Sequence, residues 1–330
     1  MLESTRPVGP NAIGIDIGGT KIAGAVVDAE GRILAEDRVA TPTGRPDAII
    51  ESVVGMIARL ESAHEVAAAG IASPGFIDAA QSTVYYTANI GWRNEPVRER
   101  LRERIPHLAI TIDNDANAAA WAEYRFGAGR GVGNMTMLTI GTGVGGAVVA
   151  DGRLLRGGFG SAGESGHFVI VPDGLLCGCG ARGCVEQYGS GRALLRMADA
   201  IADAGGIGAA LADLRRDRGR LDGAGVGALI AADDPGALAA LAELGGHLGR
   251  ACASLSAVLD PELFVFGGGV AEAGHRLIDP IRSSYLEHLP ARGYHPEPEF
   301  AVAQLVNGAG MVGAADLARQ RSAAVQPAVA

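Results

Sequence analysis

The feature that most constrains the fold of this chain is a strand, a glycine turn and a returning strand that occur twice. In the first copy, apolar residues alternate over 12–17, and Gly18 and Gly19 then turn the chain. Two further strands are expected at 22–27 and 32–39. The pattern therefore predicts a three-stranded meander with a glycine turn after its first strand.

The second copy lies more than 100 residues later in the chain. A strand is expected at 135–140, a turn at 141–146 with the sequence GTGVGG, and a returning strand at 147–150. The returning segments also read alike, VVDAEGRIL from Val26 and VVADGRLL from Val148. This echo suggests an internal duplication that gives two related domains.

The remaining pattern mixes helices and strands. Apolar periodicity predicts a helix at 46–63 and a short strand at 66–72. Residues 190–259 are rich in alanine, leucine and arginine and are expected to be mostly helical. A buried-type strand at 263–270 ends in three glycines, and a terminal helix is expected at 310–324. This alternation is typical of an α/β protein.

Composition excludes several classes of protein. A length of 330 residues allows two domains, and 48% hydrophobic with 20% charged residues fits a globular chain. A net charge of −9 argues against nucleic-acid or anionic-membrane partners. The first ten residues show no apolar signal segment. Residues 131–150 are uncharged but rich in glycine, which fits strand, turn and strand better than a membrane span. We therefore expect a cytoplasmic protein.

Two familiar nucleotide-binding motifs nearly match this sequence, but the element that follows each of them does not fit. GIDIGGTK has the glycine spacing of a Walker A loop but reads Thr-Lys where Lys-Ser/Thr is needed. GTGVGG fits G-x-G-x-x-G through Gly141, Gly143 and Gly146. A strand follows each motif, whereas a dinucleotide site needs a helix N-terminus for the pyrophosphate. A dinucleotide-binding fold is therefore not expected.

Two glycine turns between antiparallel strands are able to hold phosphate instead. Glycine permits positive φ and close approach of the backbone, so successive N–H groups form an anion-binding concavity. Thr20 and Thr142 would add hydroxyl donors, and Asp16 would hold Mg²⁺ through water. Lys21, the only lysine, either neutralises phosphate charge or is a solvated surface residue. The alternative is two ordinary tight hairpins.

A cysteine cluster predicts a metal site. Cys177, Cys179 and Cys184 follow His167 closely, and one imidazole with three thiolates makes a closed tetrahedral set that suits structural zinc. Such a site has no open position for catalysis and would instead hold a glycine-rich loop rigid. Cys252, in a helical stretch, is expected to be a small buried hydrophobe.

A group of polar residues, DNDAN at 113–117, follows a predicted strand at 108–112 and precedes a predicted helix at 118–124. A carboxylate there could simply cap the helix. It could also accept the proton of a hydroxyl group during phosphoryl transfer, as an aspartate does in kinases. Asp113 is expected to be a bystander.

These motifs together resemble a known family. DIGGT, GTGVGG, the strand ending in GGG and ESGH followed by CGCGARGC are similar to motifs of the actin-like, Hsp70-like and sugar-kinase superfamily. Within it the chain resembles the repressor, open-reading-frame and kinase (ROK) family, closest to the zinc-containing ATP-dependent glucokinases of actinobacteria, from about residue 12 to residue 320. Ala147 stands where a third consecutive glycine is common.

The resemblance implies an α/β actin-like ATPase (ribonuclease H-like) fold, with two domains on mixed five-stranded sheets around a central cleft. The small domain would comprise 1–119 plus a returning helix at 311–330. The large domain, 120–310, would carry the zinc site and the adenosine pocket.

The resemblance also assigns roles. Asp115 would be the general base, which is typically worth about 10²- to 10⁴-fold in rate. The implied sugar-binding residues are Asn89, Asn114, Glu164, His167 and Glu186. The implied ATP-binding residues are Asp16, Gly18, Gly19, Thr20, Lys21, Gly141, Thr142, Gly143, Gly267, Gly268 and Gly269. His167 would also be a zinc ligand.

The implied activity is transfer of the γ-phosphate of ATP, with Mg²⁺, to the 6-hydroxyl of glucose by a homodimer or homotetramer. Fructose, mannose or an N-acylhexosamine is the main alternative substrate, and polyphosphate the alternative donor. A sugar-sensing repressor is disfavoured because only 11 residues precede the first strand, too few for a helix-turn-helix.

Overall fold

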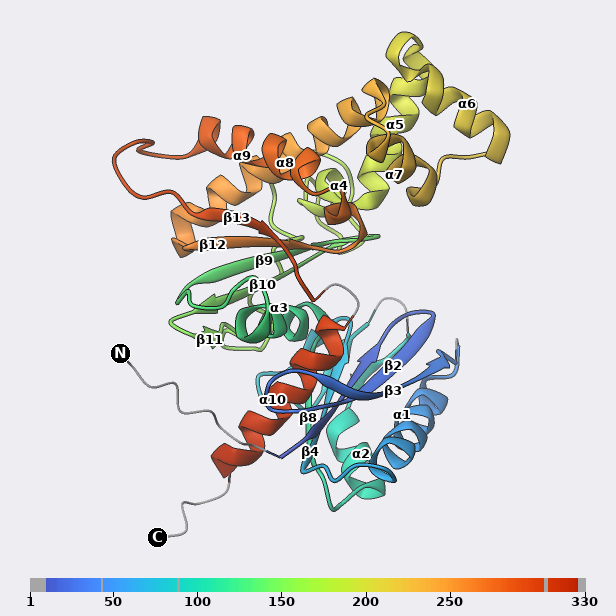
Figure 1. Cartoon of the computed structure of the whole chain (residues 1–330), viewed down its shortest axis with the longest axis vertical. Coiled ribbons are helices and arrows are strands. Elements are labelled where there is room, and N and C mark those ends of the chain that lie inside the picture. Colours follow the sequence, from blue (N-terminus) through green and yellow to red (C-terminus); the bar gives the residue numbers. More distant parts are fainter. Residues whose placement is uncertain (1–9, 43, 88–89, 306–307, 326–330) are drawn as a thin grey trace. The chain divides into compact units, whose positions relative to one another are not determined.

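A computed structural model describes residues 10–42, 44–87, 90–305 and 308–325 (Figure 1). The chain packs into two compact units, one made of 1–131, 154–162 and 305–330, the other of 132–153 and 163–304. We call them unit 1 and unit 2. The domain boundaries at 119/120 and 310/311 stay a prediction.

Unit 1 is built on a mixed sheet with the strand order β3-β2-β1-β4-β8. The strands are β1 (Ala12–Ile17), β2 (Lys21–Val27), β3 (Ile33–Ala40), β4 (Ala68–Ser73) and β8 (Ala109–Asn114). β1 pairs antiparallel with β2 and parallel with β4, and β4 pairs parallel with β8. The carboxyl ends of β1, β4 and β8 therefore lie at the same edge of the sheet.

The two faces of this sheet are covered by different kinds of side chain. Large residues such as Ile13 and Ile15 form one core with the buried residues of α1 (Pro46–Glu61) and α2 (Val97–Arg104). The opposite core is rich in alanine and includes Ala12, Ala25 and Ala68 together with residues of α3 (Asp115–Phe126) and α10 (Ala309–Val325). Small side chains let these two helices approach the strands closely.

Glycines determine how close α10 comes to the sheet. A Cβ added at Gly14 would lie 1.8 Å from the carbonyl oxygen of Met311, and one at Gly70 would lie 1.9 Å from that of Ala314. Only glycine fits between a strand and a helix backbone at such a distance. α10 therefore lies directly on β1 and β4, beside α3 (Figure 1).

A buried carboxylate ties α10 to α3. Asp316, only 2% exposed, accepts a hydrogen bond from Nε1 of Trp121 at 2.9 Å. Arg125 and Arg319 form ion pairs with the same carboxylate at 3.2 and 2.6 Å. This pairing offsets the desolvation of the buried charge.

Unit 2 repeats the same sheet. Its strand order is β11-β10-β9-β12-β13. The strands are β9 (Met135–Ile140), β10 (Val144–Ala150), β11 (Arg153–Leu154), β12 (Leu263–Gly267) and β13 (Glu299–Val302). β9 pairs antiparallel with β10 and parallel with β12, which pairs parallel with β13. The equivalent strand order of the two five-stranded sheets supports the predicted duplication.

The helices of unit 2 agree with the predicted helical region. They are α4 (Glu186–Gly189), α5 (Gly191–Ala204), α6 (Ala209–Arg218), α7 (Gly223–Ala231), α8 (Pro235–Leu259) and α9 (His275–His288), with 3₁₀ turns η1 (Gly206–Gly208) and η2 (Gly269–Ala273). α8 packs against α9, where Gly249 leaves no room for a Cβ because the carbonyl oxygen of Ile281 would be 2.3 Å away. Cys252 is fully buried in this core, as predicted.

Among the described residues, no single helix is long and apolar enough to cross a membrane. One pair passes by length and composition only when taken together, α7 with α8, bent by 106°. Residues of both helices belong to the hydrophobic core of unit 2.

Three sequence predictions were wrong in detail. β10 begins at Val144 rather than 147, because Gly145 and Gly146 pair with Thr139 and Leu138 of β9. The helix predicted at 118–124 begins at Asp115. β12 ends at Gly267 because Gly268 has a φ of +83°. A small sheet of β5 (Phe76–Ile77), β6 (Val84–Tyr86) and β7 (Arg93–Glu95) was not predicted.

Candidate functional site

Two carboxylates meet at the carboxyl edge of the sheet of unit 1. Asp16 is near the end of β1, and Asp115 follows β8 as the first residue of α3. The pKa of Asp16 is raised to about 6, mainly by burial and also by the negative charge of Asp115, whereas the positive charge of Lys21 acts in the opposite direction. Burial also raises the pKa of Asp115, against hydrogen bonds from the N–H groups of Ala116 and its own residue. Two neighbouring acids with raised pKa values are typical of a functional site.

Asn114, and not Asp115, caps α3. Its Oδ1 accepts the N–H groups of Ala116 and Asn117 at 2.8 and 3.1 Å, and its Nδ2 donates to the carbonyl of Gly75 at 3.0 Å. The capping role that the sequence left open for the carboxylate therefore belongs to the asparagine. Asp115 is left at the helix N-terminus, where the helix dipole favours its ionised form.

Asp113 lies behind these residues and does more than the sequence indicated. It is buried, and its Oδ2 accepts hydrogen bonds from Gln81 at 2.8 Å and from Nη2 of Arg156 at 2.6 Å. Its Oδ1 accepts from Nδ2 of Asn117 at 3.0 Å. The network holds the end of β8 and the start of α3 in place. Arg156 carried no sequence signal, because it lies in a loop 43 residues away.

The first glycine turn, Gly18 to Thr20, joins β1 to β2 and is held by a residue that sequence reasoning missed. Thr41 donates its hydroxyl to the carbonyl of Gly18 at 2.7 Å and its N–H to the carbonyl of Thr20 at 3.0 Å. Gly18 does not have a positive φ, and a Cβ there would lie 2.9 Å from the carbonyl oxygen of Lys21. Close approach, rather than positive φ, is the reason for glycine at this position.

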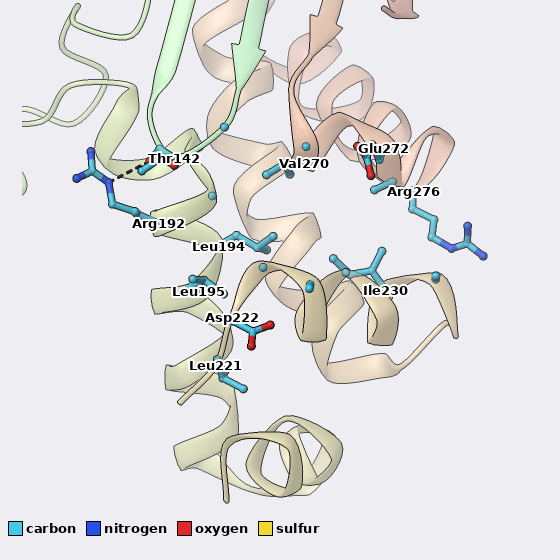
Figure 2. Close-up of a pocket in the computed structure, with 18 of the residues that line it drawn as sticks. Thr142, Arg192, Leu194, Leu195, Leu221, Asp222, Ile230, Val270, Glu272 and Arg276 are labelled. Atoms are coloured by element: carbon cyan, nitrogen blue, oxygen red, sulfur yellow. Dashed lines mark hydrogen bonds between the residues drawn. The ribbon is translucent and has the colours of Figure 1, made fainter. Parts of the chain in front are cut away.

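The second glycine turn, Gly141 to Gly143, joins β9 to β10 and is held by the start of α5. The N–H of Gly191 donates to the carbonyl of Gly141 at 2.8 Å, and Nε of Arg192 donates to that of Thr142 at 3.0 Å (Figure 2). Neither Gly141 nor Gly143 has a positive φ. A Cβ at Gly143 would lie 2.2 Å from Oε2 of Glu186.

A pocket of about 970 Å³ in unit 2 begins at this turn. Thr142 and Arg192 lie at one end, and Leu194 and Ile230 contribute apolar surface farther in (Figure 2). Its lining residues are Gly141, Thr142, Gly191, Arg192, Leu194, Leu195, Arg220, Leu221, Asp222, Gly223, Ala224, Gly227, Ile230, Ala231, Gly269, Val270, Glu272, Ala273 and Arg276. A cavity of this volume, with a polar turn at one end and both apolar and charged side chains farther in, is suited to a small organic ligand.

The sequence found only part of this pocket. Of the predicted glycines after β12, Gly269 lines it, whereas Gly267 ends the strand and Gly268 packs against Ile140. The contributions of α5, α7 and η2 were missed. Leu194 and Ile230 are ordinary apolar helix residues, so their sequence carries no signal of a site.

The predicted metal ligands do come together. One atom from each of His167, Cys177, Cys179 and Cys184 lies within 4.8 Å of all the others. Sγ of Cys177 is 3.7 Å from Nδ1 of His167, and the Sγ atoms of Cys179 and Cys184 are 3.6 Å apart. A tetrahedral zinc ion with Zn–S bonds of about 2.3 Å has ligands about 3.8 Å apart. The donor set therefore fits structural zinc.

The thiol chemistry is consistent with a metal. Burial raises the pKa of Cys184 to about 12, so a metal cation is needed to hold that sulfur as a thiolate near neutral pH. The pKa of Cys179 is lowered, mainly by the N–H of Ala181. The four cysteines are free thiols. The loop between the ligands contains two isolated β-bridges, Val169 with Cys184 and Leu176 with Arg182, and no regular strand or helix among the described residues 168–185, so a metal ion would add to its rigidity.

The candidate metal ligands lie next to residues predicted to bind sugar. Glu186 begins α4 two residues after Cys184, and its N–H donates to the carbonyl of Gly166 at 2.9 Å. His167 donates its N–H to the carbonyl of Glu164 at 3.0 Å, so these residues lie in one tight turn. Nδ1 of His167 faces the thiol cluster, which leaves Nε2 for another partner. Asn89 lies outside the described residues.

Comparison with known proteins agrees with these features. The profile of the ROK family matches residues 12–321. The chain is 44% identical over 312 residues to a glucokinase of Streptomyces coelicolor, covering 93% of this chain and 97% of the relative. It is 34% identical over 314 residues to an N-acetylmannosamine kinase of Escherichia fergusonii, covering 93% and 98%.

A solved structure is similar to this chain over most of its length. The crystal structure of a ROK family glucokinase from Streptomyces griseus in complex with glucose and AMPPNP has a TM-score of 0.83 and 43% identity, covering 94% of this chain and 99% of that one. The two mixed five-stranded sheets are those of the actin-like ATPase fold, as predicted. The family profile covers the chain from β1 to α10, and the chain therefore belongs to the ROK family.

Proposed function

We propose that this chain is an ATP-dependent glucokinase, which transfers the γ-phosphate of ATP to the 6-hydroxyl of glucose. The observation that carries the proposal is Asp115, an aspartate with a raised pKa beside Asp16 at the sheet edge, in a chain 44% identical to a glucokinase. The glucokinase structure with glucose and AMPPNP supports both substrates.

Asp115 is the general base. Its carboxylate accepts the proton of the sugar hydroxyl as that oxygen attacks the γ-phosphorus and the bond from phosphorus to the β-phosphate oxygen breaks. The raised pKa makes Asp115 a stronger proton acceptor than an ordinary aspartate. Asn114 and Asp113 keep it in position, because they fix the strand end and the helix start on either side.

The glycine turns bind the phosphates. The N–H groups and hydroxyls of Gly18 to Thr20 and Gly141 to Gly143 donate to phosphate oxygens. Mg²⁺, when bound with the nucleotide, neutralises charge that develops on these oxygens. Asp16 carries the carboxylate that suits it, and Lys21 lies close enough to influence the pKa of Asp16. The adenosine occupies the 970 Å³ pocket, which includes Gly269.

The zinc loop orders the sugar-binding residues. His167, Cys177, Cys179 and Cys184 would hold structural zinc, and four protein ligands would leave no open position to activate water. Because Nδ1 of His167 faces the thiol cluster, it would be the metal ligand, and Nε2 would then carry the proton and donate to a sugar hydroxyl. Glu164 and Glu186, on either side of the loop in sequence, provide acceptors, and Asn89 and Asn114 complete the proposed sugar contacts.

One alternative substrate class has a specific observation in its favour. The 34% identical relative from E. fergusonii is named as an N-acetylmannosamine kinase. The second proposal is therefore a ROK kinase for another hexose or an N-acylhexosamine, with the same base and the same zinc loop. ATP rather than polyphosphate as donor, a cytoplasmic location and a homodimer or homotetramer are further proposals.

The test is a coupled ADP-release assay with Mg-ATP across glucose, mannose, fructose, N-acetylglucosamine and N-acetylmannosamine. We expect the highest kcat/KM for glucose, and a loss of at least 10²-fold in Asp115→Asn. Asp113→Asn is the matched comparison, because it removes a neighbouring charge and should act on stability more than on proton transfer. Preference for an N-acylhexosamine would support the second proposal, and no turnover by folded, zinc-replete protein would refute both.

A further inference from the structure

The zinc loop and the second glycine turn are joined by a bridge of two charged side chains. Oε2 of Glu186 accepts the N–H of Val144 at 3.2 Å, and Oε1 accepts from Nη2 of Arg192 at 3.3 Å. Nε of Arg192 donates to the carbonyl of Thr142 at 3.0 Å. One carboxylate and one guanidinium therefore hold both the tip of the turn and its exit into β10.

The backbone around the bridge is shaped to admit it. Gly143 has no side chain at the point where the carboxylate of Glu186 lies, since a Cβ there would be 2.2 Å from Oε2. Gly191, next to the arginine, donates its N–H to the carbonyl of Gly141. Ser190 caps α5 by accepting the N–H of Ala193 at 3.2 Å, which fixes the helix start that carries Arg192.

Arg192 also carries its charge at the edge of the pocket, which it helps to line. Its side chain is 60% exposed, whereas that of Glu186 is 14% exposed. Figure 2 shows the guanidinium beside Thr142, away from the apolar surface of Leu194 and Ile230. In the described part of the chain, Nη1 has no recorded protein partner, so its two N–H groups are available to a ligand. A guanidinium with free donors at the polar end of a pocket is suited to a phosphate group.

We propose that Arg192 is a nucleotide-positioning residue, which orients the Gly141–Gly143 turn and contacts the phosphates, and that Glu186 links this role to the zinc loop. The inference rests on the proposed function, because it takes the pocket to be the nucleotide site. It gives Glu186 a second task besides sugar binding. Ordering of the zinc loop then favours nucleotide binding even when no sugar is present.

The experiment measures AMPPNP binding by calorimetry to full-length, zinc-replete protein without sugar. The variants are Arg192→Gln, Arg192→Lys, Glu186→Gln and the double variant, and Arg196→Gln is the matched control. Arg196 is exposed on the same helix, donates to the carbonyl of Gln187 and does not line the pocket. Metal analysis checks that each protein retains its zinc.

We expect Arg192→Gln to weaken binding about tenfold, because a charge-assisted contact and the hold on the turn are both lost. Arg192→Lys should recover only part of the loss, since lysine cannot bond the turn and the carboxylate with one planar group. Arg196→Gln should bind within twofold of the unmodified chain. The double variant should lose less than the sum of the two single losses, because Glu186 and Arg192 share one ion pair.

Steady-state kinetics separates positioning from general damage. In Arg192→Gln the KM for ATP should rise while the KM for glucose stays within about twofold. Equal binding of AMPPNP by Arg192→Gln and the unmodified chain would overturn the inference, as would additive losses in the double variant. Those outcomes leave the kinase proposal standing if the unmodified chain phosphorylates glucose. Failure of the unmodified chain to bind AMPPNP would instead refute the proposed function.

Discussion

Replacing Gly310 by alanine tests whether the position of Asp16 matters for catalysis. Gly310 lies in the first turn of α10, and a Cβ there would be 2.7 Å from Oδ2 and 2.9 Å from Cγ of Asp16. Ordinary contact between such atoms begins at about 3.5 Å. The carboxylate must therefore move by about 0.8 Å (3.5 minus 2.7) or the helix must lift from the strand.

This substitution should lower the catalytic rate without lowering the stability of the fold. Misplacing a catalytic group by about 1 Å can cost about 10²-fold in rate, so we expect kcat with Mg-ATP to fall by about 10- to 100-fold. Alanine has a higher helix propensity than glycine, by up to about 1 kcal/mol, so the melting temperature should not fall by more than a few degrees. Loss of activity without loss of stability is the signature of the displaced carboxylate.

The assay is the coupled ADP-release measurement, with thermal unfolding measured on the same samples. Gly308→Ala is the matched control, because a Cβ there comes no closer than 3.1 Å to Cδ1 of Ile33, the flexible end of that side chain, and 3.9 Å to the carbonyl oxygen of Leu305. This control should keep kcat within about twofold. A kcat equally unchanged in Gly310→Ala, with stability preserved, would show that the reaction does not depend on where Asp16 lies.

The remaining predictions concern pH, metal and packing. The pKa values of Asp16 (about 6) and Asp115 are raised, mainly by burial, so kcat/KM should fall as the pH drops through about 6. Folding stability should fall as the pH rises from about 4 to 6, because ionisation of these groups is disfavoured in the folded state. A flat kcat/KM between pH 5 and 8 would contradict this prediction. Cys184→Ser should reduce bound zinc from one per chain to nearly none, as measured by metal analysis. It should also speed proteolysis between residues 168 and 184, as measured by limited trypsin digestion. Full zinc retention would rule out the proposed ligand set. Gly313→Ala places a Cβ 1.7 Å from the carbonyl oxygen of Ala118, so it should lower the free energy of unfolding by about 1–3 kcal/mol or more. The urea midpoint of unfolding should fall accordingly. An unchanged midpoint would show that α10 shifts freely.

Local sequence was sufficient for the parts of this protein that depend on neighbouring residues. Alternating apolar residues before Gly18 and Gly141 determined the two hairpins, because period-two patterning selects strands. The cysteine spacing brought the metal ligands together, since 177, 179 and 184 lie in one short loop. The local pattern at 113–117 indicated a strand end followed by a helix, whereas the base role of Asp115 came from the resemblance to the family and stays a proposal.

Tertiary structure decided everything that depends on residues far apart in the chain. Asp113 meets Arg156 across 43 residues, and Trp121 meets Asp316 across 195. The link between Glu186 and Val144, the pocket formed by α5, α7 and η2, and the glycines that seat α10 also arise only when the sheets are assembled. No local pattern encodes these contacts, because each residue in them has an ordinary neighbourhood in sequence and gains its role from its packing partner.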